Sequence, residues 1–358
     1  MSFLEAQQLR VRYGRADVLN GLDLGVERGT LTALLGASGS GKTTLLRAIA
    51  GFSPVAAGRV LLDGQDITAL PPERRRMAMV FQSYALWPHM TVAQNIGYGL
   101  RLRRVPRAEI AAKVESMLAL LELPGLGPRN VTQLSGGQRQ RVALGRALAI
   151  DPDVLLLDEP LSNLDARIRV ELRQQIRALQ RRIGITAVHV THDREEAMVM
   201  ADRIVVLRDG RIAQAGTPLE VYHRPRDPFV ARFMGADNVV RVAATGDDGG
   251  LLVEAGGQQA HLPVGEGGVH LQADRAEGPF DAHFRAAAAR LLPAGAALPP
   301  GYLGLPGRIA ASSYPGDVWR YAVDAAGQRF LIDDATEFGE AAEVRVAVPA
   351  SALHLFPA

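Results

Sequence analysis

The chain has 358 residues, of which 47% are apolar, so it is long enough for two domains and too apolar to be an intrinsically disordered protein. No run reaches the roughly 18 consecutive apolar residues of a membrane-spanning helix, and the first residues do not resemble a signal peptide, so we expect a soluble intracellular protein. The absence of cysteine excludes disulfide bonds and thiolate metal sites.

The net charge of +2 is unevenly distributed along the chain. Residues 1–235 carry 32 lysines and arginines against 23 acidic residues, whereas residues 236–358 carry 8 against 15. The positive excess in the first part is explained by a solvated surface or by an anionic ligand. Only Lys42 and Lys113 are lysines, so a lysine within a motif calls for its own explanation.

The order of apolar runs in the first part predicts a largely parallel α/β sheet. An apolar run at residues 31–35 precedes a glycine- and serine-rich stretch at 36–41 and a helical pattern at 42–50. Further short apolar runs typical of buried strands occur at 77–81, 154–157, 185–190 and 203–207. The pattern between them is mostly helical at about 83–150, which predicts a helical subdomain inserted into the α/β core.

Two of the predicted helices have an apolar face that we expect to be part of the core. The first face consists of Ile110, Val114, Met117, Leu118 and Leu121. The second consists of Leu164, Ile168, Leu172, Ile176, Leu179 and Ile183.

Beyond about residue 235 the pattern changes to the alternation typical of strands. Apolar and charged residues alternate over 319–324 and again over 344–348. We therefore predict a first domain at 1–235 and a β-rich domain at 236–358, within which the glycine- and alanine-rich segment 246–306 has no clear pattern.

The glycine-rich stretch has the pattern of a loop that binds phosphate, between a strand and a helix. In such a loop the backbone amides and the helix N-terminus face the phosphates, Lys42 reaches the β- and γ-phosphates, and the Thr43 hydroxyl binds Mg²⁺. The alternative is a glycine and serine turn without a ligand. The predicted nucleotide-binding residues here are Gly36, Ala37, Ser38, Gly39, Ser40, Gly41, Lys42, Thr43 and Thr44.

Two carboxylates, Asp158 and Glu159, follow the apolar run that begins at Val154. An open α/β sheet binds its ligands at the carboxyl ends of its strands. Asp158 is then expected to hold Mg²⁺ and Glu159 to polarise the attacking water. Taken alone, the two acids could equally begin a surface loop.

The residues Leu134-Ser135-Gly136-Gly137-Gln138, followed by Arg139-Gln140-Arg141, resemble the signature of ATP-binding cassette (ABC) proteins. Without that resemblance they read as a helix cap. The resemblance extends along most of the first domain and implies a P-loop NTPase core that binds ATP and Mg²⁺ and hydrolyses ATP to ADP and phosphate. It also implies that Ser135, Gly136, Gly137, Gln138 and Asp165 act in trans, at the nucleotide site of a second copy.

The same family pattern implies roles for three separate residues. Tyr13 resembles the aromatic residue that stacks on adenine, Gln82 the glutamine that couples the nucleotide and its Mg²⁺ to the membrane partner, and His192 the switch histidine. Each has an ordinary explanation by itself: Tyr13 as a half-buried strand residue, Gln82 as a surface amide and His192 as a structural histidine. Ala37 stands where many relatives have proline, at a variable position of the loop.

The resemblance is to importers in particular. The segment Ser83–Val92 is expected to expose aromatic residues and a proline toward a membrane permease, or else to form a hydrophobic staple on Asn95-Ile96. The second domain resembles the oligonucleotide-fold-like (TOBE) domain of importer ATPases for maltose, polyamines, sulfate and ferric iron. Residues 271–277 lack the Arg-Pro-Glu motif of such relatives, which puts a regulatory site there in doubt.

The expected assembly follows from this resemblance. It comprises two copies of the chain, permease subunits and a solute-binding protein, with the chain at the cytoplasmic face of the cell membrane and ferric iron or a polyamine as cargo. The alternatives are an ABC ATPase without a transport role and a P-loop kinase. The first alternative is disfavoured because DNA-maintenance relatives insert long coiled coils and translation relatives carry two cassettes, neither of which occurs here. The second is disfavoured because a P-loop kinase would lack the signature found at 134–138. No nucleic-acid partner is expected, because the second domain carries net negative charge.

Overall fold

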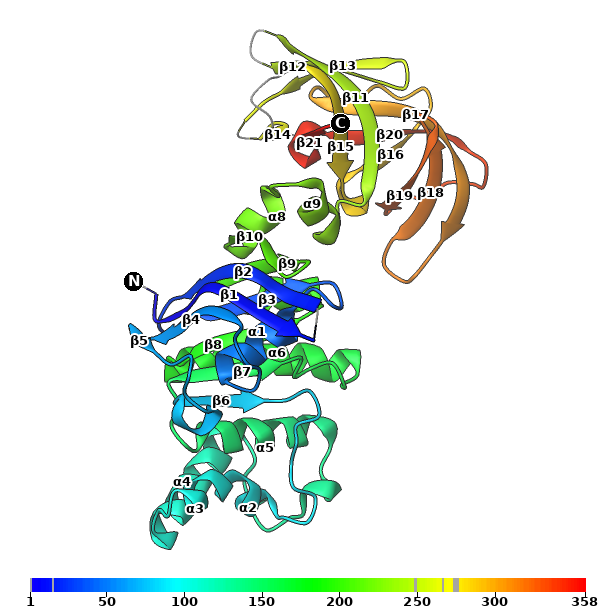
Figure 1. The fold of residues 1–358 in the computed structure, drawn as a ribbon. Helices are drawn as coiled ribbons and strands as arrows, with labels where there is room; N and C mark the ends of the chain where they lie inside the picture. Colours follow the sequence, from blue (N-terminus) through cyan, green and yellow to red (C-terminus); the bar gives the residue numbers. More distant parts are fainter. Residues whose placement is uncertain (1, 15, 248–249, 266, 273–276) are drawn as a thin grey trace. The chain divides into compact units, whose positions relative to one another are not determined.

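The computed structural model describes residues 2–14, 16–247, 250–265, 267–272 and 277–358 (Figure 1). The chain divides into two compact units, Met1–Pro218 and Leu219–Ala358. Each unit has its own sheets, and the domain boundary at residue 235 stays a prediction. No helix in the described part of the chain has the length and apolar character of a membrane span.

A six-stranded sheet forms the centre of the first unit, in the order β10-β9-β3-β8-β7-β6 (Figure 1). All neighbours are parallel except β9 and β10. Every residue of β3, β7 and β8 is buried, as near-continuous apolar runs predict. The five predicted strands are confirmed, and the sheet comprises β3 (Leu31–Gly36), β6 (Met77–Val80), β7 (Val154–Asp158), β8 (Thr186–Thr191), β9 (Arg203–Arg208) and β10 (Arg211–Gly216).

A second, antiparallel sheet of the first unit was not predicted. Its order is β2-β1-β4-β5, with β1 (Leu4–Tyr13), β2 (Ala16–Val26), β4 (Ala57–Leu62) and β5 (Gln65–Asp66). Irregularities interrupt the pairing of β1 with β2, so the apolar alternation along β1 is broken. Helix α1 (Lys42–Ala50) contacts strands of both sheets and buries Leu45, Leu46 and Ile49 in their shared core.

The helical insertion is confirmed, because the described chain between β6 and β7 contains helices and no strand of either sheet. These helices gather beyond β6 in Figure 1. They are α2 (Val92–Ile96), α3 (Tyr98–Leu102), α4 (Arg107–Leu120) and α5 (Gly136–Leu148), with short 3-10 turns at Pro72–Arg74 before β6 and Val131–Gln133 before α5.

The predicted apolar faces are largely buried, with one error. On α4, Val114, Met117 and Leu118 lie in the core. On α6 (Ala166–Ile183), Leu172 and Ile176 are buried, but Ile183 is 39% exposed. The helix ends there because Gly184 adopts a left-handed conformation, with φ of 65°, and turns the chain away. Helix α7 (Arg194–Met200) follows β8.

The second unit consists of two antiparallel-rich sheets preceded by two short helices, α8 (Pro218–His223) and α9 (Pro228–Phe233). One sheet has the order β13-β12-β11-β15-β21-β14 and the other β16-β20-β17-β18-β19. The strands are β11 (Asn238–Asp247), β12 (Gly250–Ala255), β13 (Gln258–Pro263), β14 (His270–Leu271), β15 (Gly278–Phe284), β16 (Arg290–Pro293), β17 (Tyr302–Ser313), β18 (Trp319–Ala325), β19 (Gln328–Asp334), β20 (Glu343–Pro349) and β21 (His354–Pro357), with 3-10 turns at Ala286–Ala288 and Ala350–Ala352.

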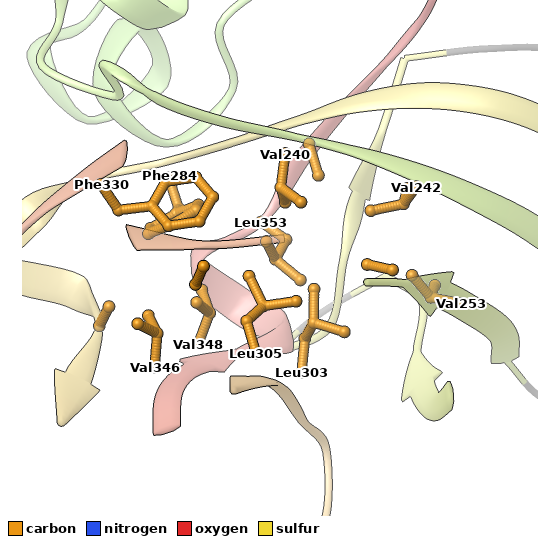
Figure 2. Close-up of a cluster of buried hydrophobic side chains, with 14 of the residues drawn as sticks. Val240, Val242, Val253, Phe284, Leu303, Leu305, Phe330, Val346, Val348 and Leu353 are labelled. Atoms are coloured by element: carbon orange, nitrogen blue, oxygen red, sulfur yellow. The ribbon is translucent and has the colours of Figure 1, made fainter. Parts of the chain in front are cut away.

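The core of the second unit confirms the predicted β-rich architecture. Phe284, Phe330 and the valines of β20 at 346 and 348 meet in one buried cluster (Figure 2). Tyr321 and Val323 of β18 also face this core, as their alternation predicted. Of the segment 271–277, where a regulatory motif was in doubt, residues 273–276 lie outside the described chain.

Candidate phosphate-binding and hydrolysis site

The glycine-rich loop connects β3 to α1, and the Lys42 ammonium group closes it. Nζ of Lys42 donates to the carbonyl oxygens of Gly36 and Ala37, each at 2.8 Å. Burial lowers the pKa of Lys42, while the nearby carboxylates of Glu159 and Asp158 raise it. A buried cation therefore lies within the loop, where a bound phosphate would provide its countercharge.

Glycine is required at the start of this loop for steric reasons. A Cβ atom on Gly36 would lie 2.6 Å from the backbone oxygen of Leu207 on the neighbouring strand β9. Gly41, which precedes α1, has a φ of 102° that favours glycine. The loop can thus form only with glycine at these two positions without displacement of the backbone.

An open hollow brings the two halves of the site together. Its lining comes from β2, from the loop and α1, and from the ends of β7 and β8. The lining residues are Val18, Ser38, Gly39, Gly41, Lys42, Thr43, Thr44, Glu159 and His192. Tyr13 and Gln82 are not among the described residues that line this hollow.

Thr43 and Asp158 present two oxygen atoms side by side. The Thr43 hydroxyl donates to Oδ1 of Asp158 at 2.9 Å. Burial raises the pKa of Asp158, and the hydrogen bond from Thr43 opposes this. A carboxylate and a hydroxyl are the hard oxygen ligands that Mg²⁺ prefers, and two of them leave room for water and phosphate oxygens. These residues therefore fit a Mg²⁺ ion.

Glu159 and His192 face each other at the carboxyl ends of adjacent strands. Oε2 of Glu159 lies 3.4 Å from Nδ1 of His192. The Glu159 backbone has a φ of 45°, and its N–H donates to the Val190 oxygen of β8 at 3.1 Å. A non-glycine residue held in this region is strained, and such strain is concentrated at functional sites. The pair offers a proton acceptor and a hydrogen-bonding imidazole next to the phosphate loop.

Tyr13 and Gln82 do not line the hollow, and neither do the loop residues Gly36, Ala37 and Ser40 or the carboxylate Asp158. Tyr13 is half-exposed at the end of β1, where its hydroxyl group is 2.7 Å from Oγ of Ser53. Gln82 is exposed after β6, and its backbone oxygen accepts a hydrogen bond from Asn163 Nδ2 at 3.0 Å. Their roles stay predictions.

The signature residues form the first turn of α5. Ser135 and Gln138 make a capping box, in which Gln138 N donates to Ser135 Oγ at 3.3 Å and Ser135 N donates to Gln138 Oε1 at 3.0 Å. A Cβ on Gly136 would lie 2.8 Å from Cδ2 of Leu164, so this turn packs on the segment before α6. That segment ends at Asp165, which caps α6 by accepting from Ile168 N at 3.0 Å.

We call residues 135–138 together with Leu164 and Asp165 the signature patch. Its members meet in space although about 30 residues separate them in the sequence, and none of them lines the hollow among the described residues. The residues predicted to act in trans are therefore gathered in one place, and their role in trans stays a prediction.

The segment Ser83–Val92 is a packed loop. The Trp87 ring lies 4.1 Å from that of Tyr98, and the guanidinium of Arg146 lies over Trp87 at 4.8 Å. Asn95 accepts from Trp87 N at 3.0 Å and donates to its oxygen at 3.2 Å. Tyr84 is only 7% exposed, so the expectation that this aromatic residue is exposed was wrong. Its φ is 62°, in the left-handed region that non-glycine residues seldom adopt.

A cluster of buried polar groups on both sides of His192 in the sequence was not predicted. Within β8 and α7, Glu196 accepts from Thr191 Oγ1 at 2.9 Å and lies 2.7 Å from His189 Nε2, all three side chains being buried. Burial alone would raise the pKa of Glu196, but the hydrogen bond and charge of His189 lower it. Buried polar residues on an otherwise apolar strand were the available signal.

Comparison with known proteins supports a nucleotide-dependent transport role. A family model described as "ABC transporter" matches residues 19–162. The chain is 45% identical to "Fe(3+) ions import ATP-binding protein FbpC" of Rhizobium etli over 92% of this chain and 90% of that protein. It is 54% identical to "Sulfate/thiosulfate import ATP-binding protein CysA" of Thermosynechococcus vestitus over 64% of this chain and 68% of that protein.

A solved structure gives the same result for the fold. It is that of cbiO1 from Clostridium perfringens, described as part of an ABC transporter complex. The TM-score is 0.57 at 30% sequence identity, and the match covers 62% of this chain and 91% of that one.

Proposed function

The chain belongs to the ATP-binding subunits of ABC importers, which hydrolyse ATP to drive transport, and we propose that it energises the import of ferric iron. One observation carries the catalytic part of the proposal. Lys42, Thr43 and the facing pair of Glu159 and His192 line one hollow beside a phosphate-binding loop, and Asp158 is joined to them by the hydrogen bond that Thr43 donates to it. That set provides charge stabilisation for phosphates, oxygen ligands for Mg²⁺ and a base for water.

The reaction is the transfer of the γ-phosphoryl group of ATP to water. Glu159 accepts a proton from the attacking water, the water oxygen bonds to the γ-phosphorus, and the bond from that phosphorus to the β–γ bridging oxygen breaks, releasing ADP. His192, 3.4 Å from Glu159, donates a hydrogen bond to the transferring phosphoryl group. Lys42 offsets the charge that builds up on the leaving oxygens. A Mg²⁺ ion held by Thr43 and Asp158 would neutralise phosphate charge.

A second copy of the chain completes each site. None of the described residues of the signature patch lines the chain's own hollow, which supports a site in which the helix N-terminus at Ser135 meets a nucleotide held by another copy. Two copies would therefore close on two ATP molecules, and hydrolysis would open them. Such closing and opening is a conformational switch biased by the γ-phosphate.

The chain works with membrane permease subunits, as its family does. We propose that Ser83–Val92 contacts the permease. The residue before this loop, Gln82, accepts a hydrogen bond through its backbone oxygen from Asn163, which follows Glu159 by four residues, so the loop is connected to the hydrolysis site. A peripheral position on the cytoplasmic face of the membrane and a solute-binding protein complete the proposed assembly. Ferric iron is the proposed cargo, because several similar proteins named for Fe(3+) import match across nine-tenths of the chain.

An uptake assay tests the cargo and the catalytic role together. In cells that lack this chain, wild type supplied in trans should restore uptake of radiolabelled ferric iron, and Glu159→Gln should not. Uptake of labelled sulfate and of a labelled polyamine is measured in the same cells. Restoration of either of these in place of iron would refute the cargo, and iron uptake supported by Glu159→Gln would refute the need for hydrolysis.

A further inference from the structure

Helix α6 and the segment after β8 are joined by side chains that have no role in the hydrolysis mechanism proposed above. Arg169 and Arg173 are one helical turn apart on α6, so both project from the same face of that helix. Both reach Asp193, the residue that follows His192. The structure therefore connects α6 to Asp193, the residue next to the switch histidine.

Arg169 contacts both ends of this connection by itself. Its Nη2 donates to the backbone oxygen of Leu164 at 3.1 Å, and its Nη1 lies 3.7 Å from Oδ2 of Asp193. Leu164 belongs to the signature patch, where its side chain packs against Gly136. One guanidinium group thus joins the backbone of the signature patch to the chain next to His192.

Arg173 makes a second and shorter contact with Asp193. It is 4% exposed, and its Nη2 donates to the same oxygen of Asp193 at 2.6 Å, while its Nη1 pairs with Glu195 at 3.1 Å. A buried guanidinium is costly to leave unpaired, so this contact fixes Asp193 against α6.

The backbone on both sides of His192 is fixed in turn. Asp193 N donates to Thr191 Oγ1 at 3.0 Å, and Asp193 Oδ1 accepts from Glu196 N at 3.1 Å. Thr191 is itself bonded to the buried Glu196. A displacement of Asp193 must therefore move His192, and with it the 3.4 Å approach to Glu159.

We propose that Arg169 is a positioning residue that transmits contact at the signature patch to His192 of the same chain. In the dimer of the proposed function, on which this inference rests, the nucleotide at the signature patch belongs to the second copy. Its arrival fixes Leu164, and Arg169 and Asp193 then hold His192 against Glu159. Each copy hydrolyses its own ATP rapidly only when the other site is filled.

Arg177 provides a matched control on the same helix. It lies two turns beyond Arg169 and pairs with Asp202, through Nη1 at 2.9 Å and through a second contact of Nη2. Removing it deletes a comparable arginine–aspartate pair of α6 but touches neither the signature patch nor His192. A general weakening of α6 would affect Arg169→Gln and Arg177→Gln alike.

The experiment measures ATP hydrolysis by the full chain as a function of ATP concentration. Arg169→Gln should lower kcat by about ten- to a hundredfold, the range for a small misplacement of a catalytic group. It should also reduce the Hill coefficient to 1, while the Kd for ATP stays within about twofold of wild type. Arg177→Gln should keep wild-type kcat and cooperativity. Arg169→Lys should be intermediate, since lysine keeps the charge but lacks the two-pronged donor geometry.

The outcomes separate this inference from the proposed function. In a Glu159→Gln background, ATP should produce a dimer by size-exclusion chromatography with or without Arg169→Gln. If the Glu159→Gln single variant stays monomeric with ATP, the proposed dimer is refuted, and the inference with it. If the Glu159→Gln variant dimerises but Arg169→Gln keeps the wild-type kcat and Hill coefficient, only the inference is refuted. The inference is also refuted if Arg177→Gln lowers kcat and the Hill coefficient as much as Arg169→Gln does, or if Arg169→Gln loses ATP binding.

Discussion

Replacement of Lys42 by alanine tests the phosphate loop most specifically. The ammonium group bonds two loop carbonyls at 2.8 Å and is the only lysine in the hollow, although arginine supplies nearly every other cation of the chain. In the nucleotide complex we expect it to turn to the β- and γ-phosphates. Lys42→Ala should therefore weaken ATP and ADP binding and leave AMP binding unchanged, because AMP lacks both phosphates.

The magnitude follows from the bonds that are exchanged. A hydrogen bond to a charged group contributes about 1.5–3 kcal/mol, which corresponds to roughly a 10- to 150-fold change in Kd. Lys42 gives up two carbonyl contacts to bind phosphate, so we expect the lower half of that range. Burial lowers the pKa of Lys42, and the negative charge of a bound phosphate opposes that shift.

The assay is a direct titration of the full chain with ATP, ADP and AMP. Lys113→Ala is the control, because Lys113 is the only other lysine and pairs with Asp151 at 2.6 Å on the surface of the helical insertion. An ATP Kd within twofold of wild type in Lys42→Ala, or an equal loss with AMP, would refute the phosphate role.

Three further predictions concern other parts of the molecule. Gly36→Ala should lower unfolding stability by about 1–3 kcal/mol, because its Cβ meets an immobile backbone oxygen at 2.6 Å; an unchanged Tm would contradict this. Tyr13→Ala should weaken the binding of ATP but not that of inorganic triphosphate, and Tyr13→Phe should bind both ligands with wild-type affinity; an equal loss of affinity for both ligands in Tyr13→Ala would exclude adenine stacking. Burial and the Arg285 charge lower the pKa of His354 to about 3, so the unfolded chain takes up its proton first as pH falls from about 6.5. Between pH 7 and pH 5 this group should therefore lower the stability of the C-terminal unit by about 2 kcal/mol, measured by Trp319 fluorescence in a Trp87→Phe background. His354→Gln should show a smaller loss than wild type, and some loss should remain because the pKa values of His270 and His283 are also lowered by burial.

The sequence predicted the parts of the fold that local pattern determines. The strand at 31–35, the phosphate loop and the helix at 42–50 form one continuous motif, and α1 begins and ends where the pattern placed it. The buried strands β7 and β8 were recognisable because parallel strands with both faces covered are continuously apolar.

The parts that were missed depend on pairing between distant segments. The sheet of β1, β2, β4 and β5 is interrupted by bulges, and the strands between residues 246 and 306 are short and lie in a glycine- and alanine-rich segment, so neither shows clear alternation in the sequence. Ile183 was placed in the core because periodicity does not show where a helix ends. The contacts of Arg169 and Arg173 with Asp193 join α6 to α7 across a strand, and nothing local indicates them.

In the proposed mechanism Glu159 activates water for ATP hydrolysis in this hollow. Single-turnover measurement of phosphate release from bound ATP by purified wild type and Glu159→Gln tests it most directly. We predict that the variant binds ATP with wild-type affinity, forms an ATP-dependent dimer and releases no phosphate above the uncatalysed rate. Phosphate release at the wild-type rate by a variant that binds ATP normally would show that Glu159 is not the base.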